Sequence, residues 1–153
     1  YQFLHANLMH LLGNMLFLKV FGDNVEDRLG RGPFLLFYMV TGLVAGLAHV
    51  VINPTSTIPS IGASGAISGV LGAYLLLFRS NRVRVLVFYS IIEVPAWMMI
   101  GFWAVQQFIA TMGDIAVTEE TGGVAYAAHA GGFVAGLVLT PLLAMLKGRR
   151  RQF

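Results

Sequence analysis

Residues 28–52 read RLGRGPFLLFYMVTGLVAGLAHVVI, an apolar run that follows two arginines and precedes a loop without Lys or Arg. A helix rises 1.5 Å per residue, so about 20 apolar residues cross a hydrocarbon core of about 30 Å. The stretch 34–52 matches that length. It therefore predicts a helix that crosses a membrane and begins on a basic side.

The same relation between apolar length and charge recurs along the chain, and we expect spans at 8–21, 34–52, 63–78, 83–109 and 124–146. All ten Lys and Arg residues fall on what alternating crossings would make one side, whereas the loops 53–62 and 111–123 contain none. Basic loops stay on the cytoplasmic side of membranes. The sequence thus predicts an all-α, polytopic transmembrane helix bundle of five spans, in a cell membrane, with cytoplasmic basic loops and C-terminal tail.

The composition supports a membrane domain. Hydrophobic residues make up 57% and charged residues 11% of the chain, which leaves too little polar surface for a compact soluble domain. The aromatic residues lie inside apolar runs and are not interleaved with arginines, which argues against nucleic-acid binding. The chain lacks Cys, so disulfides, thiol nucleophiles and thiolate metal sites are excluded. Because residue 1 is Tyr and not Met, we expect 1–153 to be one membrane domain that is incomplete at its N-terminus.

A few polar residues fall within the predicted spans, where each is costly and suggests a function. His10 and Asn14 are four residues apart and share one helical face. Ser64 opens a span between Gly62 and Gly65, where a backbone can approach closely and a helix N-terminus offers free N–H groups. Counted along ideal helices, these residues and His129 all lie in the outer half of the membrane. Together they could supply a nucleophile, a general base and oxyanion donors for acyl transfer.

Each of these residues also has an ordinary structural interpretation. A Ser in a membrane helix often bonds to a carbonyl one turn earlier, and an intramembrane His or Asn often bonds to a neighbouring helix. We interpret His49 in this structural way, and the glycines spaced four apart as packing positions. A metalloprotease is disfavoured because HExxH is absent and because His5 and His10, five apart, do not share a helical face. We expect no metal and no cofactor.

The acidic residues favour a catalytic pair without a third carboxylate. Glu93 is expected inside the fourth span, near its cytoplasmic end and far from His129. The tautomer of His129 would then be set by backbone, water or packing. The outer loop 111–123, which holds Gly122 and Gly123, is expected to move and to cover the site.

Three motifs resemble those of the rhomboid family of intramembrane serine proteases. The stretch 5–14, HANLMHLLGN, is similar to the family's HxxxxHxxxN signature, GASG at 62–65 to its GxSG motif, and AHAGGFVAG at 128–136 to its AHxxGxxxG helix. The resemblance implies a Ser64 nucleophile, a His129 general base, and an oxyanion hole that includes His10 and Asn14. It also implies single-span membrane proteins as substrates, cut near the outer face of the membrane. The alternative is a catalytically inactive membrane chaperone or receptor on the same bundle.

Overall fold

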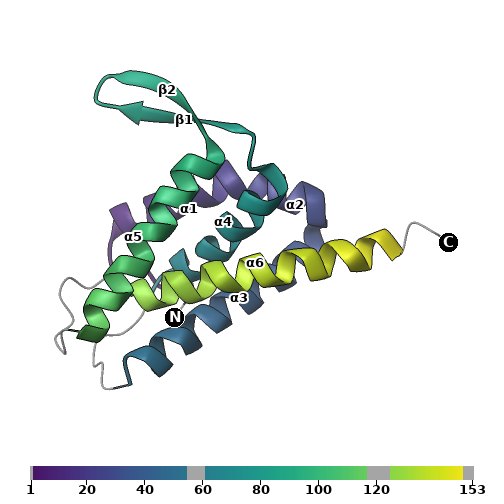
Figure 1. The fold of residues 1–153 in the computed structure, drawn as a ribbon. Helices are drawn as coiled ribbons and strands as arrows, with labels where there is room; N and C mark the ends of the chain where they lie inside the picture. The colour runs from purple at the N-terminus through teal and green to yellow at the C-terminus, as the bar shows by residue number, and fades with distance from the viewer. Residues whose placement is uncertain (1, 55–60, 117–124, 150–153) are drawn as a thin grey trace.

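The computed structural model describes residues 2–54, 61–116 and 125–149, and most of these are helical (Figure 1). The elements are α1 (Leu8–Phe17), the π-helix η1 (Leu18–Gly22), α2 (Asp23–Leu29), α3 (Arg31–Ile52), α4 (Ser64–Phe78), β1 (Arg82–Val87), β2 (Ser90–Pro95), α5 (Ala96–Ala116) and α6 (Tyr126–Arg149). The segment 8–21 thus begins a longer helical run that continues through η1 and α2 to Leu29.

Helix α4 lies at the centre of the bundle. All of its residues from 65 to 74 are buried, and they are apolar or small on every side of the helix. A helix without a polar face has to be covered by other elements. Helices α3 and α6 pack against α4 and against each other, while α5 packs on α6. The largest buried side chains of this core include Phe37 of α3, Leu71 of α4 and Ile100 of α5.

The helices α3 (Arg31–Ile52) and α6, over Tyr126–Met145, are long and apolar enough to cross a membrane, and among the described residues no other helix meets both criteria. Helix α4 is apolar but shorter. The expected spans at 34–52 and 124–146 therefore correspond to α3 and α6. The spans at 8–21, 63–78 and 83–109 have not been confirmed as crossings.

The fourth predicted span is wrong in its first half, and so is the all-α class for that segment. Residues Arg82–Val87 and Ser90–Pro95 form an antiparallel hairpin in which Val83 pairs with Val94 and Val87 with Ser90. Helix α5 begins only at Ala96 and continues to Ala116. The segment is rich in Val and Ile, which favour strands. Pro95 also disfavours a helical conformation in the residue before it.

Two further expectations change with this hairpin. Glu93 does not lie in a helix: it is on β2, is exposed, and lies 3.5 Å from the Nε of Arg84. The predicted outer loop 111–123 is also displaced, because residues up to Ala116 belong to α5. The rest of that loop, including Glu119, Glu120 and the glycine pair, lies outside the described residues, so its predicted motion stays a prediction.

Glycines bring α4 and α6 together at backbone distance. A Cβ added to Gly72 of α4 would lie 2.6 Å from the carbonyl oxygen of Phe133 on α6. A Cβ added to Gly132 or Gly136 of α6 would overlap the carbonyl groups of Gly65 and Gly69 on α4. This confirms the packing role expected of these glycines, and it fixes the spacing between the helix that begins at Ser64 and the helix that contains His129.

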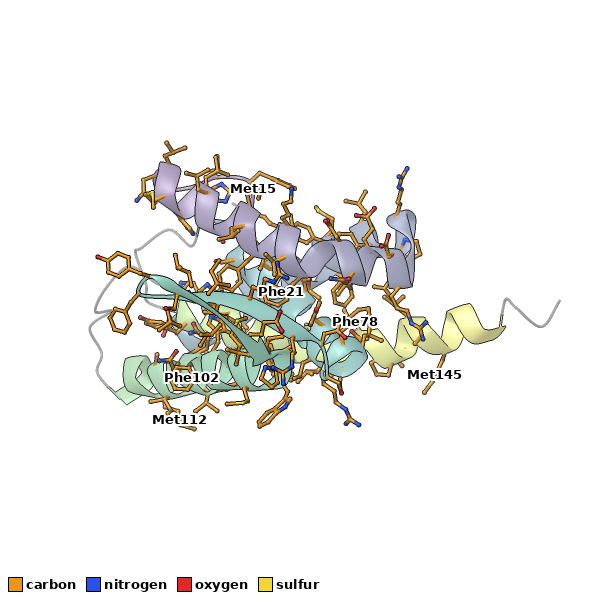
Figure 2. The ribbon with its side chains drawn as sticks, turned by 90° about the horizontal axis from the view of Figure 1, so that it is seen from above. Met15, Phe21, Phe78, Phe102, Met112 and Met145 are labelled. Carbon is orange, nitrogen blue, oxygen red and sulfur yellow. The ribbon has the colours of Figure 1, made fainter. Side chains whose placement is uncertain are left out.

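Seen from above, α1 and α5 lie on opposite sides of the hairpin (Figure 2). Met15 marks α1 in this view, whereas Phe102 and Met112 mark α5. All three side chains are exposed in the described structure. The outer faces of α1 and α5 are therefore apolar, as expected of helices that face lipid or another membrane protein.

Candidate active site

Ser64 and His129 are hydrogen-bonded to each other. Ser64 is the first residue of α4, and His129 lies one turn into α6. The Oγ of Ser64 is 2.8 Å from the Nε2 of His129. Both side chains are half-buried, and the close packing of α4 on α6 just described allows this short distance. A hydroxyl and an imidazole in this relation are the nucleophile and base required for covalent acyl transfer.

The other ring nitrogen of His129 contacts the buried side chain of Gln107 on α5. The Nδ1 of His129 lies 2.8 Å from Oε1 of Gln107, and Nε2 of Gln107 donates to the carbonyl oxygen of Trp103 at 3.5 Å. The second bond orients the amide so that its oxygen faces the imidazole. An amide oxygen can only accept, so Nδ1 carries the hydrogen and Nε2 presents its lone pair to Ser64. The expectation named backbone, water or packing for this role, and the structure adds a side-chain amide at Nδ1 that the sequence did not suggest.

Aromatic packing adds to this support of His129. The Trp103 ring lies 6.1 Å from the His129 ring, measured between centroids, and 5.9 Å from the ring of Phe133. Thr111 donates its hydroxyl to the backbone carbonyl of Gln107 at 2.8 Å. Helix α5 therefore places one aromatic ring and one amide against His129.

His10 and Asn14 of α1 lie against the turn that leads into Ser64. Gly62 has a φ of +119°, and an added Cβ there would lie 2.8 Å from Cε1 of His10 and 3.5 Å from Nδ2 of Asn14. Glycine is needed here both for its φ and for this close approach. The structure thus brings the four predicted site residues to the N-terminal end of α4, with His10 and Asn14 beside the residue two positions before Ser64.

The side chain of Asn14 is buried in α1. Its Nδ2 has no hydrogen-bond partner among the described residues. A buried donor without a partner costs free energy, roughly 1–3 kcal/mol. Such a donor is available to an oxygen that enters the site. The ring of His10 makes an edge contact with that of His5, at 5.3 Å between centroids.

His49 lies apart from these contacts. It is buried on α3, and its backbone carbonyl accepts from the N–H of Asn53 at 2.8 Å. An apolar cavity of about 610 Å³ lies between α3, α5 and α6, and its lining includes Val44, Phe108 and Val134 but none of the four predicted site residues. We do not assign a ligand to this cavity.

Gln107 and Trp103 were missed in the sequence, although a signal for them was present. Gln107 lies in an apolar stretch, and a polar residue inside a membrane helix suggests a function by the same criterion that selected His10. Trp103 is four residues earlier and so shares its helical face. Among possible partners of His129, the sequence argument weighed the acidic residues alone, and Gln107 carries no charge.

A family model of the rhomboid domain matches residues 1–146. The chain belongs to the rhomboid family. Rhomboids are helical membrane proteins and are generally intramembrane serine proteases, although some rhomboid-like members are inactive. The three rhomboid motifs of this chain therefore lie in a domain that matches the family over nearly its whole length.

Individual rhomboids are similar to this chain over different shares of its length. The rhomboid protease GluP of Bacillus subtilis is 46% identical over 79 residues, which are 52% of this chain and 15% of that protein. Rhomboid-like protein 11, chloroplastic, of Arabidopsis thaliana is 32% identical over 92% of this chain and 50% of its own length. Rhomboid protein 1, mitochondrial, of Saccharomyces cerevisiae is 30% identical over 98% of this chain and 42% of its own length.

This chain thus spans half or less of the length of these relatives. Two of them are named as chloroplastic or mitochondrial proteins. The cell membrane and the cytoplasmic position of the basic loops therefore stay predictions for this chain.

Proposed function

We propose that this chain carries the active site of an intramembrane serine endopeptidase, with Ser64 as nucleophile and His129 as general base. The observation that carries the proposal is the 2.8 Å contact between Ser64 Oγ and His129 Nε2. The rhomboid family supports the reaction class. In this mechanism Oγ attacks the scissile carbonyl carbon while Nε2 takes its proton. His129 then gives that proton to the leaving amine, and water hydrolyses the acyl-enzyme by the same route.

The oxyanion of the tetrahedral intermediate needs donors that are already in place. The Nδ2 of Asn14 is buried without a partner among the described residues, and the His10 ring lies beside it against Gly62. Ser64 is the first residue of a helix, where the backbone N–H groups have no partner within the helix. We assign these three groups to the oxyanion hole.

Gln107 serves as a positioning residue in this proposal. It holds the hydrogen of His129 on Nδ1 and the lone pair of Nε2 toward Ser64, as the two hydrogen bonds of its amide require. An amide carries no charge, so it orients the ring but stabilises the imidazolium less than a carboxylate would. The reaction therefore depends on a dyad that a neutral side chain orients.

The substrates we propose are single-span transmembrane proteins, cut near the outer face of the membrane. Ser64 and His129 lie at the ends of α4 and α6 that are opposite to the basic residues Arg79 and Lys147. If the basic ends face the cytoplasm, as basic loops do in membrane proteins, the dyad faces the outer half. A substrate helix has to unwind there to expose its peptide bond.

Labelling of the full protein in membranes tests the nucleophile. A serine-directed phosphonate probe should react with the wild type and with Ser80→Ala, a matched change at an exposed serine after α4. It should not react with Ser64→Ala. Mass spectrometry of a cleaved transmembrane substrate then locates the cut. An intact protein that neither reacts at Ser64 nor cleaves any transmembrane substrate would favour the inactive chaperone or receptor.

A further inference from the structure

The hairpin β1–β2 presents an apolar tip that the described structure does not cover. Since Val87 pairs with Ser90, the turn consists of Phe88 and Tyr89. The side chain of Phe88 is 90% exposed and that of Tyr89 is fully exposed. Leu86 and Ile91 beside them are also mostly exposed. Figure 1 shows the hairpin projecting from the helices, which it joins at the end of α4 and the start of α5.

The turn is not built for stability in water. Turns of two residues between strands favour Asn, Asp and Gly, because at least one residue takes a positive φ. Here Phe88 occupies that position with a φ of +54°. An aromatic residue is disfavoured in this conformation, and an isolated pair of strands is only marginally stable in water. The backbone at Phe88 is therefore in a disfavoured conformation, in a turn that exposes two aromatic rings.

Basic side chains surround the base of the same hairpin. Arg79 follows α4, and Arg82 and Arg84 lie on β1; all three are exposed. Arg84 lies 3.5 Å from Glu93, an exposed pair that leaves the local charge positive. Aromatic residues concentrate where membrane meets water, and arginines there bind the anionic headgroups. The hairpin therefore carries arginines where it joins the helices and aromatic rings at its tip. This combination is suited to binding a lipid surface.

The open edges of the hairpin limit how deep it can lie. Backbone N–H and C=O groups at the edge of a sheet cannot be left unpaired in the hydrocarbon core. We propose that β1–β2 is an interfacial anchor on the leaflet at the basic end of the bundle. Phe88 and Tyr89 lie among the headgroups and upper acyl carbons, and Arg82 and Arg84 bind anionic headgroups. This proposal does not depend on proteolytic activity.

A fluorescent label at the tip tests the anchor in the full protein. The 153 residues contain no Cys, so Tyr89→Cys and the control Ser80→Cys each take one environment-sensitive label in this domain. Both positions are exposed, so neither change removes a buried contact. The proteins are reconstituted in phosphatidylcholine vesicles with or without phosphatidylglycerol. Separate preparations carry lipids spin-labelled near the headgroup or near the end of the acyl chain.

The label at position 89 should emit at shorter wavelength than the label at position 80. It should lose more intensity to the shallow spin label than to the deep one. Phosphatidylglycerol should strengthen this quenching, and Arg82→Gln with Arg84→Gln should remove that effect. Equal quenching at positions 89 and 80, or stronger quenching by the deep label, would overturn the proposal. So would disulfides between copies of the unlabelled Tyr89→Cys variant at high lipid dilution, because a second copy would then cover the tip.

Discussion

Oε1 of Gln107 lies 2.8 Å from Nδ1 of His129, so an uncharged amide on α5 determines which nitrogen of the imidazole faces Ser64. In serine hydrolases with a catalytic triad a buried carboxylate has this position. The difference has a measurable consequence for turnover.

Gln107→Met keeps a side chain of similar length but removes the acceptor. We expect kcat to fall about fivefold with KM unchanged, because one hydrogen bond of about 1 kcal/mol orients the reacting base. The neighbouring Gln106 is exposed, so Gln106→Met is the matched control and should retain wild-type kcat. Steady-state kinetics with a transmembrane substrate in detergent or vesicles measures both. Wild-type kcat in both variants would remove Gln107 from the mechanism.

Ser64→Ala and His129→Ala should each abolish cleavage while the protein stays folded. The double variant should be no worse than either single variant, because a nucleophile and its base act as a unit. Product formation over a long incubation, together with thermal unfolding, distinguishes lost chemistry from lost structure. His49→Ala, a histidine outside the site, should retain turnover; cleavage by Ser64→Ala above background would contradict the assignment.

Asn14→Ala should reduce kcat by about 10²- to 10³-fold, the usual cost of one oxyanion donor. Asn7→Ala is the control on the same helix, since Asn7 only caps α1 through the N–H of His10 at 2.9 Å. The control should lose about 1 kcal/mol of stability and keep its kcat. If Asn14→Ala instead lowered only the unfolding temperature, Asn14 would be an interhelical contact. His10→Ala should resemble Asn14→Ala.

Gly136→Ala should destabilise the fold by about 1–3 kcal/mol, because the new methyl group meets the backbone of Gly69 and neither backbone can yield locally. Gly101→Ala is the control on α5, where an added Cβ meets nothing within 4 Å. This control should be neutral or more stable by up to about 1 kcal/mol, because alanine favours helices. Equilibrium unfolding of both proteins in the same detergent compares them. Equal stability would show that the close approach of α4 and α6 can relax.

The sequence alone identified the helices that are long or that carry a motif. It failed for a short apolar segment, because the same residue pattern fits a strand or a buried helix. The stretch 34–52 is too long and too apolar for a strand, and α3 does cover it. Residues 83–95 are also rich in apolar residues, although they include Arg84 and Glu93. A short apolar run does not distinguish a strand from a buried helix. The frequent Val and Ile and the terminal Pro95 were the local evidence for a hairpin.

The candidate site likewise has residues that the sequence predicted and one that it did not. Motifs and the depth counted along ideal helices predicted Ser64, His129, His10 and Asn14, and helical spacing placed His10 and Asn14 on one face. Gln107 comes from another helix and belongs to no motif. Its contact with His129 depends on how α5 packs on α6, which is a property of the folded bundle. A residue of this kind is found only once the packing of the helices is known.

The backbone contacts between Gly65, Gly69, Gly132 and Gly136 have a consequence for inhibitor design. Ser64 and His129 are carried by two helices in backbone contact, which cannot slide past each other without a steric clash and would lose their closest packing if they separated. An inhibitor will therefore meet a reactive centre of fixed shape and has to adapt to it. Selectivity among rhomboids should be sought on the α1 and α5 sides, where large side chains such as Met15 and Phe102 are exposed.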